Sequence, residues 1–147
     1  MKTAIFTGSF NPFTIGHADI VGRALTIFDK VVIGVGYNIA KGEPTDLSDR
    51  IEAIKAVYAN EPRIEVHSYN CLTVDFAKQH HATAIIKGVR DVKDFEYERE
   101  MAEVNSMIGD GIETIFFFAK PELASISSSM VRELKAFGKD VRQFLPQ

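Results

Sequence analysis

The chain has 147 residues, of which 46% are hydrophobic and 25% charged, and these fractions are ordinary for one folded domain. They argue against disorder along the whole chain. The net charge of −3 argues against a protein that holds long nucleic acid by its phosphates, yet it leaves room for a small phosphorylated ligand.

Two features indicate the compartment. Cys71 is the single cysteine, so no intramolecular disulfide is possible, which is typical of a reducing environment. The N-terminal residues lack the long apolar core of a signal peptide, and no apolar stretch reaches the roughly 20 residues that span a bilayer. We therefore expect a cytoplasmic protein that does not bind membranes.

Short runs rich in β-branched and aromatic residues alternate with longer amphipathic segments. Five of the short runs are predicted strands: Thr3–Thr7, Val31–Gly36, Ile64–His67, Ala84–Lys87 and Thr114–Phe118. Some are continuously apolar, such as Val31–Ile33 and Ile115–Phe118, which is typical of strands that are buried on both faces.

The segments between these strands carry apolar residues at helical spacing. The stripes run from Val21 to Phe28, from Leu47 to Tyr58, from Tyr97 to Ile108 and, for a short last helix, from Met130 to Leu134. Strands that alternate with helices predict an α/β fold, here a Rossmann-like, doubly wound and mostly parallel five-stranded sheet. We expect residues 1–147 to form one domain.

The first predicted strand runs into a glycine-punctuated turn that contains Gly8, Ser9 and Phe10, and a helix then begins near Gly16 and His17. Gly8 lets the backbone come close to a ligand. The start of the helix offers free N–H groups and the positive end of its dipole, which favour phosphate. His17 is placed to reach an anion there, although an ordinary turn with a capping residue would also explain the pattern.

A second turn of this kind follows the fourth predicted strand, where Lys87 is followed by Gly88, Val89 and Arg90, and the next helix contains Glu98. A lysine at the carboxyl end of a parallel strand should project over the edge of the sheet where ligands bind. Arg90 is a forked donor that suits phosphate. A strand end with solvated charges is the alternative interpretation.

A serine-rich segment precedes the last predicted helix, and it comprises Leu123, Ala124, Ser125, Ile126, Ser127, Ser128 and Ser129. One serine is enough to cap a helix, so three in a row exceed that need. Their hydroxyls and backbone N–H groups would form an anion-binding helix start. Capping together with a polar loop remains the alternative.

These segments together resemble the signatures of the nucleotidyltransferase superfamily. Thr14–His17 is similar to the HxGH motif, with threonine in place of the first histidine, and Ile126–Arg132 is similar to the ISSSxxR motif. The sequences of Gly8–Pro12 and Gly88–Glu98 resemble those of the bacterial phosphopantetheine adenylyltransferases, as does the C-terminal segment Asp140–Pro146. The resemblance covers nearly the whole chain. It implies an enzyme that transfers the adenylyl group of ATP to 4′-phosphopantetheine, giving dephospho-coenzyme A and pyrophosphate.

The resemblance also implies residue roles. His17 would stabilise the transition state at the α-phosphate. ATP would be bound by Ser9, Phe10, His17, Gly88, Val89, Arg90, Glu98 and the segment Leu123–Ser129, and 4′-phosphopantetheine by Ser9, Lys41, Thr73 and Lys87. Four positions in these segments depart from the family pattern: Ser9 replaces the usual threonine, Asn11 the usual aspartate, Lys87 the usual arginine, and Leu123 a frequent tryptophan.

Mg²⁺ on the phosphates, coenzyme A as a feedback inhibitor and a homohexamer are further implications of the resemblance. The sequence itself shows no dedicated carboxylate cage for a metal. His67, His80 and His81 share no metal-ligand spacing with Cys71 or with a carboxylate cluster, so we interpret them as surface or strand-end residues.

Two alternatives stay open. One is a nucleotidyltransferase of the same fold that acts on another phosphorylated acceptor, such as glycerol phosphate or nicotinamide mononucleotide. The other is a non-catalytic nucleotide-binding module.

Overall fold

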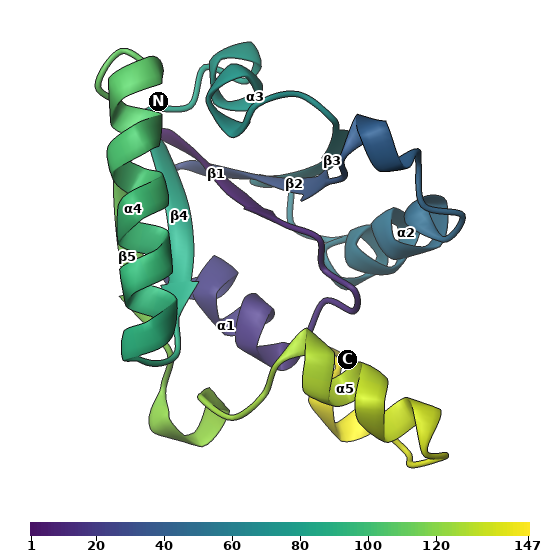
Figure 1. Ribbon diagram of the computed structural model, residues 1–147. Helices are drawn as coiled ribbons and strands as arrows, with labels where there is room; N and C mark the ends of the chain where they lie inside the picture. Colours follow the sequence, from purple (N-terminus) through teal and green to yellow (C-terminus); the bar gives the residue numbers. More distant parts are fainter.

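Five parallel strands form one sheet in the order β3-β2-β1-β4-β5, as seen in the computed structural model of all 147 residues (Figure 1). The strands are β1 (Thr3–Gly8), β2 (Lys30–Gly36), β3 (Ile64–Tyr69), β4 (Ala84–Val89) and β5 (Glu113–Phe118). All four neighbouring pairs are parallel, so the predicted α/β fold and parallel five-stranded sheet are confirmed. Each strand lies where the sequence predicts it and is one or two residues longer.

Helices cover both faces of this sheet (Figure 1). They are α1 (Ile15–Ala24), α2 (Leu47–Val57), α3 (Thr73–Gln79), α4 (Val92–Ile108) and α5 (Ser128–Ala136). One apolar cluster joins α1 and α2 to one face, and a smaller cluster joins α3 to the other. None of the helices is both long and apolar enough to cross a membrane.

The inner strand β2 is continuously apolar because both of its faces are covered. Val31, Ile33 and Val35 belong to the cluster with α1 and α2, whereas Val32 belongs to the cluster with α3, and all four are fully buried. The expectation of burial on both faces is confirmed for this strand.

The expectation of two-sided burial is wrong for β5. Only Phe117 of the run Ile115–Phe118 is buried, and Phe118 is 67% exposed. The reason is that β5 is an edge strand. Its partner helix α4 also turns an apolar stripe to solvent, with Tyr97 at 63% and Ile108 at 54% exposure. The spacing of that stripe predicts the helix correctly, but Phe95, which meets Phe116 on β5, faces the sheet instead.

The sheet opens between its central strand β1 and the neighbouring strand β4. β1 pairs with β2 through six residues but with β4 through only three, from Ala4 and Ala84 to Phe6 and Ile86. Beyond those pairs, β1 and β4 separate toward their carboxyl ends. The chain runs outward in opposite directions from β1 and β4, so this gap is the topological switch point where ligands bind in open α/β sheets.

Candidate active site

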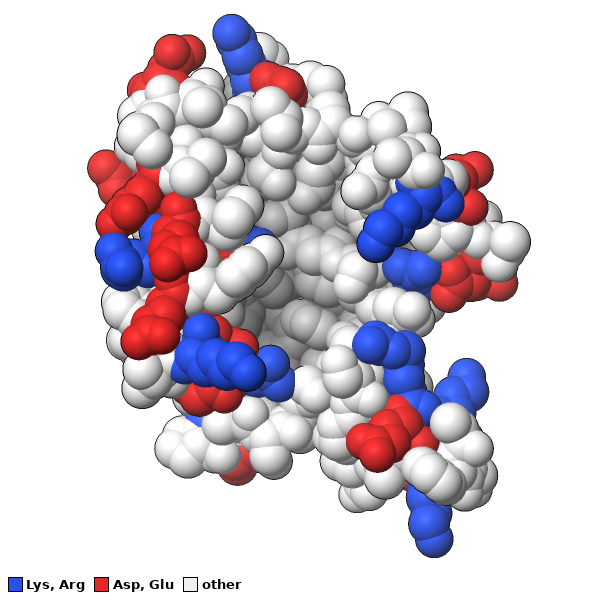
Figure 2. Space-filling view, in the orientation of Figure 1, with Lys and Arg blue, Asp and Glu red and all other residues white.

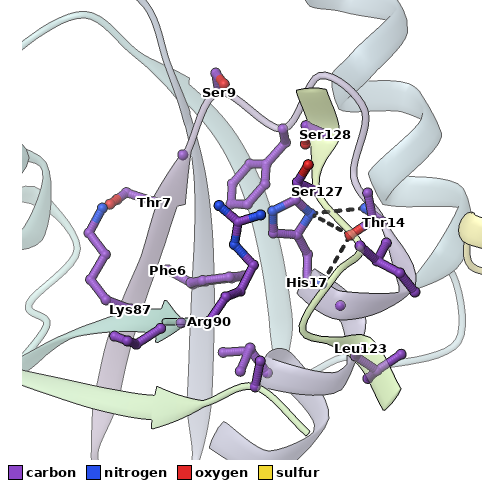
Figure 3. Close-up of a pocket in the computed structure, with 18 of the residues that line it drawn as sticks. Phe6, Thr7, Ser9, Thr14, His17, Lys87, Arg90, Leu123, Ser127 and Ser128 are labelled. Carbon is purple, nitrogen blue, oxygen red and sulfur yellow. Dashed lines mark hydrogen bonds between the residues drawn. The ribbon is translucent and has the colours of Figure 1, made fainter. Parts of the chain in front are cut away.

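A cavity of about 320 Å³ occupies the gap between the carboxyl ends of β1 and β4. The space-filling view shows that face hollowed at its centre, with lysine and arginine side chains around the rim (Figure 2). Its lining comprises Phe6, Thr7, Gly8, Ser9, Phe10, Thr14, Gly16, His17, Ile20, Lys87, Gly88, Val89, Arg90, Glu98, Ala119, Leu123, Ile126, Ser127, Ser128 and Ser129. The structure therefore brings the three sequence motifs together around one cavity (Figure 3).

His17 is oriented by the residue that begins its helix. Thr14 is the N-cap of α1, and its hydroxyl accepts a hydrogen bond from the backbone N–H of His17. In return, the backbone N–H of Thr14 donates to Nδ1 of His17 over 2.9 Å. Because Nδ1 accepts this bond, the neutral ring carries its proton on Nε2. Nε2 points into the cavity (Figure 3), so the ring is a pre-oriented hydrogen-bond donor.

Aromatic side chains surround the His17 ring. Phe13 stacks on it with ring centres 5.4 Å apart, and Phe10 meets it edge-on at 5.0 Å. The resulting desolvation, with a smaller contribution from the positive charge of Arg90, lowers the pKa of His17 from 6.5 to about 4. His17 is therefore neutral near pH 7 in the ligand-free protein.

The loop between β1 and α1 is held from the side of α2. Arg50 donates from Nη1 to the backbone carbonyl of Ser9 over 3.0 Å. The same guanidinium makes an ion pair with Asp46, one turn earlier, at 2.7 Å. Arg50 is mostly buried, so the contact fixes the position of Ser9 beside the cavity.

The first two serines of the serine run have structural partners. The hydroxyl of Ser127 accepts from the backbone N–H of Met130 and caps α5. The hydroxyl of Ser128 donates to the carbonyl of Pro12 over 2.7 Å, which ties the start of α5 to the first loop.

A second tie between α5 and the first loop comes from Arg132. Its guanidinium donates to the carbonyl of Asn11 over 2.6 Å and to the hydroxyl of Ser129 over 3.3 Å. The sequence explains three serines as anion ligands, whereas the structure gives each hydroxyl a protein partner. The backbone N–H groups of the first turn of α5 remain the natural anion donors.

Lys87 and Glu98 form an ion pair inside the cavity, with Nζ and Oε2 3.5 Å apart. Glu98 Oε2 is buried and makes no hydrogen bond, so its capacity to accept one is unused. In Figure 3, Lys87 and His17 lie on opposite sides of β1. The cavity therefore presents two separate cationic or donor positions, one on each side of the strand.

Arg90 is positioned by the helix that follows it. Its Nε donates to Asp94 Oδ2 over 3.0 Å, and the backbone N–H of Asp94 donates the capping hydrogen bond to Asp91 Oδ1. The guanidinium is held beside the ring of His17 (Figure 3). An anion that contacts Nε2 of His17 would therefore also meet the charge of Arg90.

Four of the predicted site residues do not line this cavity. Lys41 is exposed in the 3₁₀ turn Ile39–Lys41 after β2, and Thr73 is the half-buried first residue of α3, where its hydroxyl lies 3.2 Å from that of Tyr69. Ala124 and Ser125 follow the 3₁₀ turn that contains Leu123. Their roles stay predictions.

Four lining residues were missed in the sequence: Phe6, Thr7, Ile20 and Ala119. A signal existed for Phe6 and Thr7, because they end the strand that runs into Gly8. Ile20 lies three residues after His17 on α1, and a Cβ on Gly88 would approach it to 3.3 Å. A side chain on Gly88 would therefore have to displace Ile20 slightly, so packing against α1 favours glycine there, as does close approach of a ligand.

Comparison with known proteins places this site in a family. Residues 5–134 match the cytidylyltransferase-like family. The whole chain is 50% identical to the phosphopantetheine adenylyltransferase of Bacteroides fragilis and 52% identical to that of Phocaeicola vulgatus, covering 97% of each. The fold is similar, with a TM-score of 0.72 and 15% identity, to a bifunctional NMN adenylyltransferase/ADP ribose pyrophosphatase from Francisella tularensis, covering 99% of this chain and 45% of that one.

Proposed function

The chain belongs to the phosphopantetheine adenylyltransferase family, within the cytidylyltransferase-like proteins, and from that premise we propose that its cavity transfers the adenylyl group of ATP to 4′-phosphopantetheine. The products are dephospho-coenzyme A and pyrophosphate, a step of coenzyme A biosynthesis. The observation that carries the proposal is the neutral His17, whose Nε2–H is aimed into a cavity at the switch point of the sheet.

ATP would occupy the part of the cavity between the starts of α1 and α5. The free N–H groups at both helix starts favour phosphate there. Gly88, Val89 and Arg90 lie opposite, where close backbone approach and a guanidinium suit a nucleotide. Glu98 Oε2 accepts no hydrogen bond, although it lies 3.5 Å from Lys87 Nζ, and it would accept from an amino or hydroxyl donor of the nucleotide.

Transfer is a direct displacement. An oxygen of the terminal phosphate of 4′-phosphopantetheine forms a bond to the α-phosphorus of ATP. The bond from that phosphorus to the bridging oxygen breaks, and its electron pair leaves with pyrophosphate. The nucleophile is already an anion, so catalysis rests on alignment and on stabilising charge rather than on a general base. His17 Nε2–H donates to the developing charge at the α-phosphate, beside Arg90.

The acceptor would lie on the Lys87 side of β1. Lys87 would bind its phosphate, which requires the ion pair with Glu98 to open or to be shared. Ser9 lines the cavity and would lie between the two ligands. Lys41 and Thr73 follow the carboxyl ends of β2 and β3, at the same edge of the sheet, and would contact the rest of the acceptor.

Mg²⁺ is the cofactor we propose, held by ATP. Glu98 is the only carboxylate that lines the cavity, and it is paired with Lys87. That donor set fits an ion bound by phosphate oxygens and water, which is how Mg²⁺ commonly binds in phosphoryl-transfer sites. When bound, Mg²⁺ would neutralise charge on the leaving pyrophosphate.

A cytoplasmic homohexamer is proposed as the working form. The exposed apolar stripe of α4, with Val92, Tyr97, Met101, Val104, Met107 and Ile108, supports burial against another copy. The free, exposed Cys71 suits a reducing compartment. Coenzyme A contains the phosphopantetheine arm of the acceptor, so we also propose that it competes for the acceptor side. Light scattering of the purified protein tests the assembly.

The test of the activity is pyrophosphate release from ATP with a panel of acceptors. We expect turnover with 4′-phosphopantetheine and identification of dephospho-coenzyme A by mass. Glycerol 3-phosphate and nicotinamide mononucleotide should give none. Turnover with either of those, or none with any acceptor, would instead support one of the two alternative functions.

A further inference from the structure

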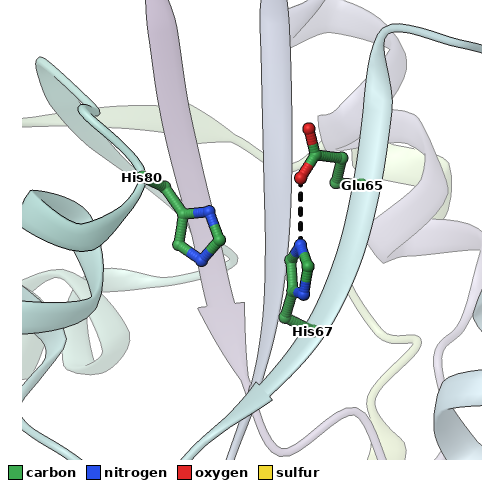
Figure 4. A group of neighbouring side chains, drawn as sticks. All are labelled: Glu65, His67 and His80. Carbon is green, nitrogen blue, oxygen red and sulfur yellow. Dashed lines mark hydrogen bonds and ion pairs between the residues drawn. The ribbon is translucent and has the colours of Figure 1, made fainter.

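A cluster of three potential metal ligands lies away from the cavity, on the edge strand β3. Glu65 and His67 are two residues apart on β3, so their side chains share one face of the sheet. His80, at the end of α3, meets them there (Figure 4). The three candidate ligand atoms all lie within 4.8 Å of one another. The sequence spacing of Glu65, His67 and His80 did not predict this group, because His80 reaches the other two only when α3 packs beside β3.

The distances are close to those of a metal site. Ligand atoms bound at roughly 2.0–2.2 Å in a tetrahedron lie about 3.3–3.6 Å apart. His67 Nε2 and Glu65 Oε1 are already 3.0 Å apart, and the rings of His67 and His80 have centres 4.7 Å apart. All three side chains are half-exposed, and binding of a metal would have to draw the ligand atoms together by up to about 1 Å.

A metal would replace the hydrogen that His67 Nε2 and Glu65 Oε1 share. A carboxylate and a neutral imidazole are the forms that bind metals. Lys30 pairs with the other oxygen of Glu65 and competes electrostatically with a cation.

We propose that Glu65, His67 and His80 bind a divalent transition metal of the zinc type, with solvent at the fourth position. Two imidazoles and one carboxylate suit Zn²⁺, and the nitrogen ligands disfavour Mg²⁺. None of the three residues lines the adenylyl-transfer cavity, so the site is separate from it. The metal would fasten the end of α3 to β3.

Calorimetric titration with zinc chloride tests the site, in a Cys71→Ser background so that the exposed thiol cannot bind the metal. We expect one zinc ion per chain. His67→Gln and His80→Ala should each weaken binding by at least ~10-fold, since loss of even an outer-shell partner costs about 10–100-fold. Circular dichroism melts verify folding, and His67→Gln keeps the test valid if His80→Ala is unstable.

His81→Asn is the matched control. His81 is the adjacent exposed histidine with a positive φ of 56°, a conformation that asparagine tolerates. It should leave zinc affinity unchanged. Equal losses in His81→Asn and His80→Ala, or no saturable binding in the parent protein, would overturn the proposal.

Lys30→Met should raise the zinc affinity, whereas the histidine variants should lower it. Removing the ammonium frees Glu65 and removes a repelling charge, so zinc should bind several-fold more tightly. Cobalt titration of the same variants should give visible absorption that disappears in His67→Gln. A Lys30→Met affinity equal to or weaker than that of the parent would show that Glu65 is not a ligand.

Discussion

The two turns that border the cavity hold their functional groups in different ways. The turn after β1 packs the half-buried His17 against aromatic rings and fixes it with hydrogen bonds to Thr14. The turn after β4 instead carries charged, partly exposed side chains in ion pairs, Lys87 with Glu98 and Arg90 with Asp94. The turn after β1 therefore keeps one neutral hydrogen-bond donor in a fixed orientation. The turn after β4 carries charged side chains whose ion pairs within the protein can be replaced by contacts with a ligand.

The largest expected effect is on turnover, when His17 is removed from the turn after β1. His17→Ala should lower kcat by at least ~10²-fold while ATP still binds, because one donor aimed at developing charge is worth roughly 2.7–4 kcal/mol. Steady-state kinetics and calorimetry with ATP measure the two quantities. The exposed His81→Asn serves as control, and near-parental turnover in His17→Ala would remove the assigned role.

Variants of the second turn should change binding more than turnover. Arg90→Ala should weaken ATP, and Lys87→Ala should weaken 4′-phosphopantetheine, each by about 10–100-fold, because hydrogen bonds to charged groups are worth about 1.5–3 kcal/mol. Calorimetry of both variants with both ligands tests the split.

The chain offers matched controls for this split. Arg99 makes the same i,i+4 ion pair on α4, with Glu103 at 2.7 Å, but does not line the cavity. Arg99→Ala and Lys93→Ala should therefore leave both affinities unchanged. Equal losses for both ligands in Arg90→Ala and Lys87→Ala would contradict separate binding positions.

Thr14→Val removes the hydroxyl that caps α1 but keeps the backbone bond to His17. We expect kcat to fall by about fivefold, the effect of one hydrogen bond worth about 1 kcal/mol, together with a lower melting temperature. Thr14→Ser retains the hydroxyl and should restore both. If Thr14→Ser is as impaired as Thr14→Val, the methyl group rather than the hydroxyl matters.

The smallest expected effect is a gain in affinity for the acceptor. Lys87→Arg should keep the enzyme active and lower KM for 4′-phosphopantetheine several-fold, because a guanidinium can grip phosphate with two parallel N–H bonds. Lys93→Arg, on the exposed start of α4, is the control. Loss of most activity would mean that the cavity is shaped around lysine.

The sequence predicts the sheet well because its signals are local. Apolar runs mark the strands, and Gly8 and Gly88 mark the two turns that meet at the switch point. The orientation of His17 also had a local signal: Thr14 and His17 have the spacing of a capping box, with histidine at the position usually held by glutamate or glutamine.

Other features depend on contacts between distant segments and could not be predicted. Arg50 reaches Ser9 from 41 residues away, and Ser128 reaches Pro12 from 116 residues away. The exposed stripe of α4 has the same period as a core-facing stripe, so spacing alone cannot tell whether the sheet or another chain covers it. Glu65 and His80 meet only because α3 folds back along β3.

The measurement that tests the central claim most directly is an NMR pH titration of the His17 ring with nitrogen-15 labelling. Because burial lowers the pKa of His17 to about 4, the ring should stay neutral as pH falls from 8 to 5 and take up a proton only near pH 4. In the neutral range the proton should reside on Nε2, since Nδ1 accepts from Thr14. A pKa near 6.5, or a proton on Nδ1, would contradict a neutral donor fixed in advance of substrate binding.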